Sequence, residues 1–293
     1  MEEQIKISVF ASAVRPKLWT SYLESLKSTS VSYEVIFSGF NTPEEVSPFL
    51  EKYPEFKYIH TKSIKPCQNY AISQRACIGE VSSWSCDDAS YDGDVLGKAY
   101  RYWKEKNNEK LILSIQTKES GYGNPQGSLF DMNLHRFFGG DPNSPIMAPM
   151  CIISTKFLNE LGGYDRRFVC GQGENSIVML AYQQGATVEI FGGPDCYIDI
   201  DHLGKSIAIG ESKDEKDFLN RPFAKGYQTD RQILEKSWTT FHPEKLISIL
   251  NSGRNQVFPS EIKIISKVQL DKFQRYEDED ILTKSQSNKG HWQ

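Results

Sequence analysis

The chain has 293 residues, of which 39% are hydrophobic and 25% are charged, as in ordinary folded globular proteins. This length suits one large α/β domain with an appendage, or two small domains. The 34 basic and 38 acidic residues nearly balance and form no basic block, which argues against a nucleic-acid partner but leaves room for a free nucleotide.

Strand and helix patterns alternate along the first ninety residues. Runs rich in β-branched and aromatic residues predict strands, and apolar residues at helical spacing predict helices between them. The alternation predicts an α/β fold with a mostly parallel central sheet flanked by helices, in which ligands bind beyond the carboxyl ends of the strands. The predicted strands cover residues 6–10, 31–37, 56–59 and 81–85, and the predicted helices cover 16–28, 43–53 and 69–78.

The alternation of strand and helix patterns continues to about residue 200. Between two of its elements, residues 120–143 form a long glycine-containing segment, and loops of this length in a compact domain are often functional. The further helices are predicted over 92–107, 155–161 and 174–184, and the further strands over 111–115, 151–153 and 187–191.

After residue 204 this alternation of strand and helix patterns ends. Residues 230–238 are predicted to be helical, 262–270 are apolar enough to pack, and the polar end is predicted to fray. We therefore expect one domain over residues 1–205, a mainly helical C-terminal extension over 206–276 that packs on it, and a flexible tail over 277–293.

Two adjacent carboxylates, Asp87 and Asp88, follow the predicted strand that ends at Ser85. An isolated Asp-Asp pair is weak evidence, because such pairs are common in turns and helix caps. At the end of a buried strand, however, carboxylate oxygens suit a hard cation such as Mg²⁺ or Mn²⁺. Such an ion neutralises a diphosphate leaving group, so the position predicts a cation and diphosphate site.

A second candidate ligand is His202, which follows an alternating run and Asp201. A solitary histidine is more often structural or simply on the surface. Imidazole is nevertheless a suitable ligand for Mn²⁺, and Lys205 nearby has the charge to pair with phosphate, although most lysines are solvated. We expect Asp88 and His202 to converge on one ion.

A third candidate lies where a glycine-containing stretch ends in Glu174 and Asn175. The glycines fit a loop that caps a helix, and the helix dipole favours Glu174 in the first turn. An acid and an amide held together beyond such a loop also suit contacts with sugar hydroxyls. Glu174 has the chemistry of a base.

These motifs resemble those of the GT-A-fold glycosyltransferases of the large family-2 type, over about residues 5 to 205. Four segments occur in the family's order: a first strand with its nucleotide loop, a helix start, a strand ending in a DxD-like motif, and a GG-(Phe/Tyr)-D…GGED-like segment. They are residues 7–16, 68–72, 84–89 and 162–175. The middle of the chain is also similar to the polypeptide N-acetylgalactosaminyltransferases, at residues 144–149, 173–175 and 196–202.

The resemblance implies a metal-dependent hexosyl- or N-acetylhexosaminyl-transferase. Its donor would be a nucleotide-sugar, with a UDP-sugar favoured, and its acceptor a hydroxyl of a carbohydrate, lipid-linked or protein molecule. It implies Mn²⁺ or Mg²⁺ as the cofactor, with Asp88 and His202 as metal ligands, because the last His is a metal ligand in the second family. Glu174 and Asn175 would be the catalytic residues. Residues 121–143 and 147–149 would shape the acceptor site. The implied nucleotide-binding residues are Ala11, Ser12, Ala13, Arg15, Gly39, Asn69, Cys86 and Asp87.

Four positions depart from the family pattern. Gln68 stands where Arg is usual, and Ala89 fills the third position of the acidic motif. Residues 38–40 stand where an acidic residue is usual, which leaves recognition of uracil to backbone groups. Asn175 replaces the Asp that inverting enzymes use as base, so either Glu174 takes that role, or the reaction retains configuration, or the protein is inactive.

The alternatives follow from these departures. One is a catalytically inactive nucleotide-sugar or carbohydrate-binding module of the same fold. Another is a nucleotidyltransferase, which shares the strand and helix alternation but normally carries a glycine-rich, basic loop after the first strand. The loop over residues 11–15 has no glycine.

The sequence also carries signals for location. Its charged start lacks the features of a signal peptide, and no apolar run approaches the ~20 residues of a membrane span. The six cysteines show neither CxxC nor zinc-ligand spacing. We expect a cytoplasmic protein, with peripheral contact to a membrane left open.

Overall fold

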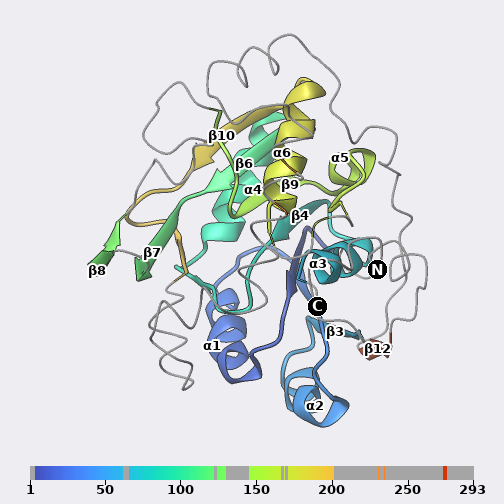
Figure 1. Cartoon of the computed structure of the whole chain (residues 1–293). Helices are drawn as coiled ribbons and strands as arrows, with labels where there is room; N and C mark the ends of the chain where they lie inside the picture. Colours follow the sequence, from blue (N-terminus) through green and yellow to red (C-terminus); the bar gives the residue numbers. More distant parts are fainter. Residues whose placement is uncertain are drawn as a thin grey trace.

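Figure 1 shows the computed structural model of the chain. It describes residues 4–61, 66–121, 124–129, 145–165, 168, 171–200, 230, 234 and 273–275.

The main sheet has eight strands in the order β10-β6-β9-β4-β1-β2-β3-β12. Every neighbouring pair is parallel except the two pairs that β9 makes, with β4 and with β6. The predicted α/β fold with a mostly parallel sheet is therefore confirmed. The strands are β1 Ile7–Ser12, β2 Tyr33–Gly39, β3 Phe56–His60, β4 Val81–Trp84, β6 Leu111–Ile115, β9 Cys151–Ser154, β10 Thr187–Phe191 and β12 Phe273–Arg275.

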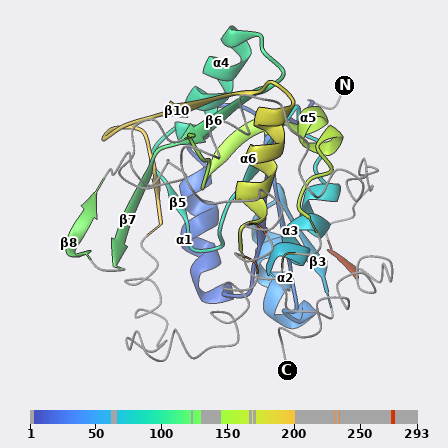
Figure 2. The same ribbon diagram turned by 45° about the horizontal axis from the view of Figure 1, so that its top comes forward.

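Three helices cover each face of this sheet (Figures 1 and 2). Buried residues of α3, α5 and α6 pack on one face, and those of α1, α2 and α4 pack on the other. Successive strand residues therefore face opposite cores, as Val9 and Phe10 of β1 do, and both are fully buried. The helices are α1 Pro16–Leu26, α2 Pro43–Lys52, α3 Pro66–Arg75, α4 Val95–Lys106, α5 Thr155–Glu160 and α6 Gly173–Gln183.

Local signals explain where these helices begin. Proline stands in the first turn of α1 and of α2, where its missing N–H costs no hydrogen bond. Thr42 caps α2 by accepting from the Glu45 backbone N–H, and the Glu45 side chain accepts from the Thr42 N–H in return. Ser154 caps α5 by accepting from the Phe157 N–H.

A buried polar cluster centred on Glu34 joins three parts of the sheet. Its carboxylate is 1% exposed and accepts from the Ser8 hydroxyl at 2.5 Å, the Ile78 N–H at 2.9 Å and the Lys57 ammonium at 2.6 Å. These charge-assisted bonds compensate for the loss of water around a buried charge. The cluster therefore stabilises the fold.

A second, smaller sheet has the strand order β5-β11-β7-β8. Its strands are β5 Ser90–Tyr91, β11 Ile198–Asp199, β7 Thr117–Gly121 and β8 Asn124–Leu129. The last two form an antiparallel pair, and all of β8 and the last two residues of β7 lie in the segment, residues 120–143, that we expected to be a long loop. Pairing satisfies the backbone groups that a free loop leaves to water. Residues 122–123 and 130–143 of that segment lie outside the described residues.

Of the predicted C-terminal extension, the structure describes Asp230, Leu234 and β12. Asp230 and Leu234 are helical and fully buried, and Leu234 joins the core beneath α3, α5 and α6. β12 adds a parallel strand to the β3 edge of the main sheet. The domain boundaries themselves stay a prediction.

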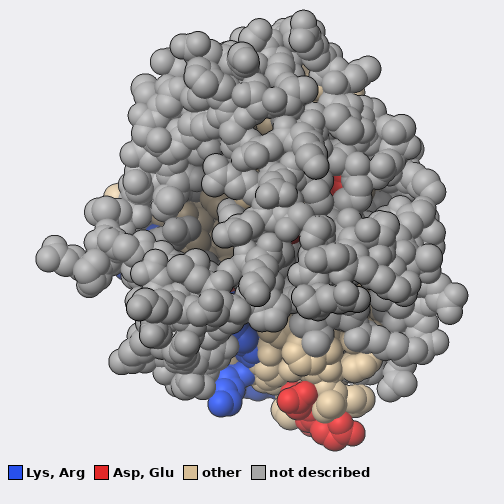
Figure 3. Space-filling model, viewed as in Figure 1, with Lys and Arg blue, Asp and Glu red and all other residues tan. Residues whose placement is uncertain are grey.

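Two surface properties bear on the expected partners. On the face shown in Figure 3, acidic and basic side chains of the described surface gather at its lower end, where α1 and α2 lie in Figure 1, so this region carries mixed charge. Within the described residues, no helix combines the length and apolar character that crossing a lipid bilayer requires. The cysteines described, Cys67, Cys77, Cys86, Cys151 and Cys196, are all free thiols.

Candidate active site

The acidic pair lies at the carboxyl ends of β1 and β4, next to the loop that joins β1 to α1. β1 and β4 are parallel neighbours, and the Ser85 N–H donates to the Phe10 carbonyl at 3.0 Å just beyond β4. The main chain therefore delivers Asp87 and Asp88 beside Val14 and Arg15. This is the edge at which parallel sheets bind ligands.

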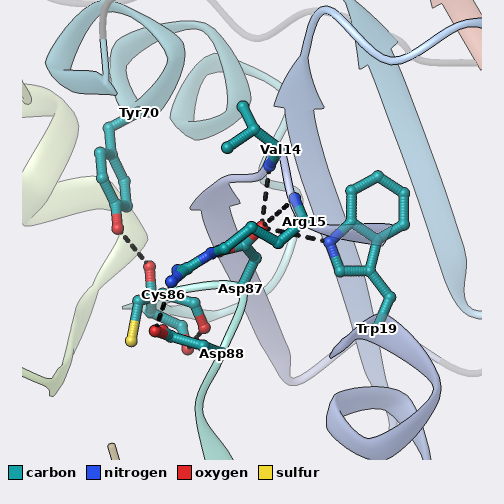
Figure 4. A network of polar contacts seen from close by, with 8 residues as sticks. Val14, Arg15, Trp19, Tyr70, Cys86, Asp87 and Asp88 are labelled. Carbon is teal, nitrogen blue, oxygen red and sulfur yellow. Dashed lines mark hydrogen bonds and ion pairs between the residues drawn. The ribbon is translucent and has the colours of Figure 1, made fainter. Parts of the chain in front are cut away.

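Asp87 is held from five directions (Figure 4). Oδ2 accepts from the backbone N–H groups of Val14 and Arg15, both at 2.8 Å, and from the Trp19 indole N–H at 3.2 Å. Oδ1 accepts from Nε and Nη2 of Arg15, at 2.9 and 2.5 Å. Both oxygens of this 2% exposed residue are thus occupied by protein donors. The arrangement favours a positioning role for Asp87 over the direct nucleotide contact that the sequence analysis expected.

Arg15 bridges the two carboxylates. Besides its contacts with Asp87, its Nη1 lies 2.6 Å from Oδ2 of Asp88, which is 1% exposed. Burial by itself lowers the pKa of Arg15, but the charges of Asp87 and Asp88 outweigh it and raise that pKa. Arg15 is therefore a fixed positive charge at the acidic pair, and its side chain is 23% exposed.

Two stacked tyrosines line the side of the site that faces α6. The rings of Tyr70 and Tyr164 lie 4.9 Å apart at 11°, and the Tyr70 hydroxyl donates to the Ser85 carbonyl at 2.5 Å. Burial raises the pKa of Tyr70 well above its ordinary value, and the negative charges of Glu174, Asp87 and Asp88 raise it further. Tyr164 in turn lies against Gly173 at the start of α6, so the tyrosine stack connects the loop after β4 with the helix that carries Glu174.

Glu174 lies in the first turn of α6, and close packing explains how the helix begins. Gln172 precedes the helix in the left-handed region, with φ of 67°. At Gly173 a Cβ would lie 2.6 Å from the Tyr164 ring, so a side chain has no room there. The Asn175 amide donates to Oε1 of Gln172 at 2.8 Å, which fixes the Asn175 side chain against this turn.

The environment of Glu174 suits a base. Burial raises its pKa, its own backbone hydrogen bond opposes the increase, and the negative charge of Asp230 adds to it. Asp230 is fully buried and accepts from the Gly171 N–H at 3.0 Å, so it lies beside the turn that leads into α6. A carboxylate with a raised pKa binds a proton more readily than an ordinary one.

Several predicted nucleotide-binding residues are buried, so their side chains are not accessible to a ligand. Ala11 and Ala13 are fully buried, and the Ala13 N–H donates to the Ser38 carbonyl at 2.9 Å. Gly39 lies so close to this loop that a Cβ would be 2.1 Å from the Ala13 carbonyl oxygen. Asn69 is 1% exposed, and its Oδ1 accepts from the Thr61 hydroxyl at 3.0 Å. These residues shape the loop from inside the protein.

Ser12 and Cys86 keep partly exposed surface at the edge of the site. Burial first, and then the neighbouring Asp88, raise the pKa of the Cys86 thiol well above its ordinary value. Cys86 therefore stays a neutral thiol and is a poor nucleophile.

The residues present fit a hard cation by donor type, because Asp88 supplies carboxylate oxygens at the ligand edge. The described residues contain no group of three or more His, Cys, Asp or Glu side chains placed to hold one. His202 lies outside the described residues. The segment before it is described: Asp199 of β11 pairs antiparallel with Ser90, two residues after Asp88.

Sequence reasoning missed three residues of the site. Trp19 stands four residues after Arg15, which is a one-turn spacing on α1, and that spacing was the available signal. Tyr70 lay inside a recognised motif but was not assigned a role. Nothing in the sequence connects Asp230 with Gly171, since 59 residues separate them.

No protein-family model matches the chain, and no curated protein sequence matches it. Among solved structures, the chain is similar to S. aureus TarS 1-349, with 16% identity and a TM-score of 0.54 over 77% of this chain and 72% of that one. It is similar to the same TarS fragment in complex with UDP-GlcNAc, with 18% identity and a TM-score of 0.53 over 67% and 58%. It is also similar to GalNAc-T7 with UDP, GalNAc and Mn²⁺, with 14% identity and a TM-score of 0.54 over 82% and 49%.

These likenesses show that the chain has the GT-A fold, as its sequence motifs led us to expect. The chain spans about half of the GalNAc-T7 chain and somewhat more of the TarS chains. At these identities the fold is what is shared, and function has to be argued from the site.

Proposed function

We propose that the chain is a glycosyltransferase that moves a sugar from a nucleotide-sugar donor, with a UDP-sugar favoured, to a hydroxyl acceptor. One observation carries the proposal. Arg15 and the acidic pair lie together at the carboxyl ends of β1 and β4 in a GT-A sheet, which is the edge at which such sheets bind ligands. The TarS complex with UDP-GlcNAc and the GalNAc-T7 complex with UDP support the donor class.

The nucleotide would lie across the ends of β1 and β2. Val14 and Phe40 follow these adjacent strands and are 36% and 39% exposed, which is unusual for large apolar side chains among the described residues. Phe40 stands where the family usually has an acid, and its ring offers a face for a base instead. Ser12 and backbone groups of the loop would bind the ribose and the base edge.

Mn²⁺ or Mg²⁺ would supply positive charge to the diphosphate leaving group. Asp88 and His202 would hold it. The pairing of Asp199 with Ser90 supports this set. β11 and β5 are antiparallel, so the direction from Ile198 to Asp199, which leads on to His202, is also the direction from Tyr91 to Ser90, which leads back to Asp88. The Mn²⁺ in the GalNAc-T7 structure agrees with this cofactor.

Glu174 would take the proton of the acceptor hydroxyl while the acceptor oxygen bonds to the anomeric carbon and the bond from that carbon to the phosphate oxygen breaks. Its raised pKa strengthens it as a base. Asn175, oriented by Gln172, would donate a hydrogen bond to the sugar or the acceptor. Residues 121–143 and 147–149 would shape the acceptor site.

The test separates binding from turnover. A thermal-shift panel of nucleotide sugars with and without Mn²⁺ identifies the donor, because a ligand that binds the native state raises the melting temperature. With that donor, Glu174→Gln should keep binding and lose turnover, and Asp88→Asn should lose metal-dependent binding. If no nucleotide sugar binds, the proposal is wrong.

The second candidate is a nucleotide-sugar-binding or carbohydrate-binding module of the same fold that has lost catalysis. It is favoured by Ala89 and Asn175, which stand where active family members carry acids. A protein of this kind would bind the donor but release no sugar from it. Slow metal-dependent hydrolysis of the donor therefore distinguishes the enzyme from the module.

A further inference from the structure

Arg15 and the two aspartates form a compact triad in which the arginine holds both acids at once. Nη2 lies 2.5 Å from Oδ1 of Asp87, and Nη1 lies 2.6 Å from Oδ2 of Asp88. The sequence predicted a metal ion and a diphosphate beside these carboxylates. In the structure, an internal cation already contacts them.

The two halves of the triad differ in how firmly they are held. Asp87 is fixed by backbone N–H groups and the Trp19 indole, and it binds Nε as well as Nη2. The Asp87 contact therefore anchors the guanidinium. The contact of Nη1 with Asp88 lies at the other end of the planar group and involves one nitrogen. A small rotation of the guanidinium breaks the Asp88 contact while the anchor remains.

The Arg15 guanidinium has more N–H donors than the acidic pair uses. It carries five N–H groups, of which Nε, one on Nη2 and one on Nη1 bond to the acidic pair within the described residues. The side chain is 23% exposed, so an anion in the site can reach the remaining N–H groups. A guanidinium matches phosphate oxygens in geometry as well as in charge.

The net charge of the triad indicates that a divalent cation binds before the diphosphate. Two carboxylates and one guanidinium sum to −1, which repels a diphosphate. A divalent cation on Asp88 changes this sum to +1. The same cation repels the nearby guanidinium from Asp88, because like charges at this range repel strongly.

We propose that Arg15 binds the diphosphate of the donor, and that in the free protein its Nη1 is instead paired with Asp88. A divalent cation and Nη1 of Arg15 then compete for Asp88. This inference rests on the proposed function. Binding of the cation releases Nη1, and the released N–H groups turn to the diphosphate of the donor while Asp87 keeps the guanidinium anchored. Arg15 therefore couples occupation of the metal site to binding of the nucleotide.

The experiment compares Arg15→Gln with Lys17→Gln, which removes the same charge from an exposed residue in the first turn of α1, two positions along the chain. Calorimetry on the whole chain measures Mn²⁺ affinity without nucleotide, and then UDP affinity at saturating Mn²⁺. Arg15→Gln should bind Mn²⁺ about tenfold more tightly and UDP about tenfold more weakly than the wild type. Lys17→Gln should change each affinity less than about twofold.

Arg15→Lys provides the second variant if Arg15→Gln fails to fold. It keeps the charge but loses the planar fork, so it should stay near the wild type for Mn²⁺ and still bind UDP more weakly. Unchanged affinities in the Arg15 variants, with a wild type that binds Mn²⁺ and UDP, would overturn this inference alone. A wild type that binds neither would overturn the proposed function as well.

Discussion

The clearest quantitative test concerns the unequal roles of the two aspartates. In Asp87→Asn, one carboxylate oxygen becomes an NH₂ group, although both oxygens now face donors. If the remaining oxygen serves the Val14, Arg15 and Trp19 N–H groups, the NH₂ faces Nε and Nη2 of Arg15. The substitution therefore replaces at least two charge-assisted bonds with donor–donor contacts.

The size of the effect follows from burial. Breaking a buried ion pair by removing one partner costs about 3–5 kcal/mol. The carboxylate is 2% exposed but the Arg15 side chain is 23% exposed, so solvent reduces the loss to about 2–4 kcal/mol. Asp88→Asn also weakens a buried pair, but it keeps an oxygen that can accept from the single Nη1 donor, so its cost should be lower, about 1–2 kcal/mol.

Thermal unfolding without ligand, followed by circular dichroism, measures both variants. At about 2 °C per kcal/mol for a chain of this size, Asp87→Asn should lower the melting temperature by about 4–8 °C. Asp88→Asn should lower it by about 2–4 °C. Equal destabilisation by the two substitutions, or a wild-type melting temperature for Asp87→Asn, would refute the conclusion that Asp87 is the more firmly bonded of the two acids.

Three further outcomes are expected. Gly39→Ala should destabilise the protein by about 1–3 kcal/mol in urea unfolding, because its Cβ would lie 2.1 Å from a carbonyl oxygen of the β1 loop; wild-type stability would contradict this close contact. Glu34→Gln should cost about 1–3 kcal/mol by the same assay, because it removes the charge that pairs with partly exposed Lys57, and a change below about 0.5 kcal/mol would show the cluster to be dispensable. Asp230→Asn should shift the acid limb of kcat/KM for donor turnover to lower pH. Burial and the Asp230 charge both raise the pKa of Glu174, so without that charge Glu174 loses its proton at lower pH; an unshifted or upward-shifted limb would contradict the coupling.

Much of the fold could be predicted because its signals are local. The bounds of β6 and β10 agree with the sequence prediction, and α1 begins at Pro16 as expected. A five-residue apolar strand and a proline at a helix start carry their information in neighbouring residues. β5 and β11 have two residues each, too few for a periodic pattern, so only their pairing defines them.

The candidate site divides in the same way. The sequence by itself determined which chemical groups are present: an acidic pair after a strand, an arginine after the first strand, and an acid at the start of a helix. Only the tertiary structure decided that Asp87 accepts from five donors while Asp88 contacts the far end of the Arg15 guanidinium, and that Asp230 reaches the turn before Glu174. The physical reason is that a carboxylate's role depends on the donors and charges that surround it, and packing brings those from distant parts of the chain.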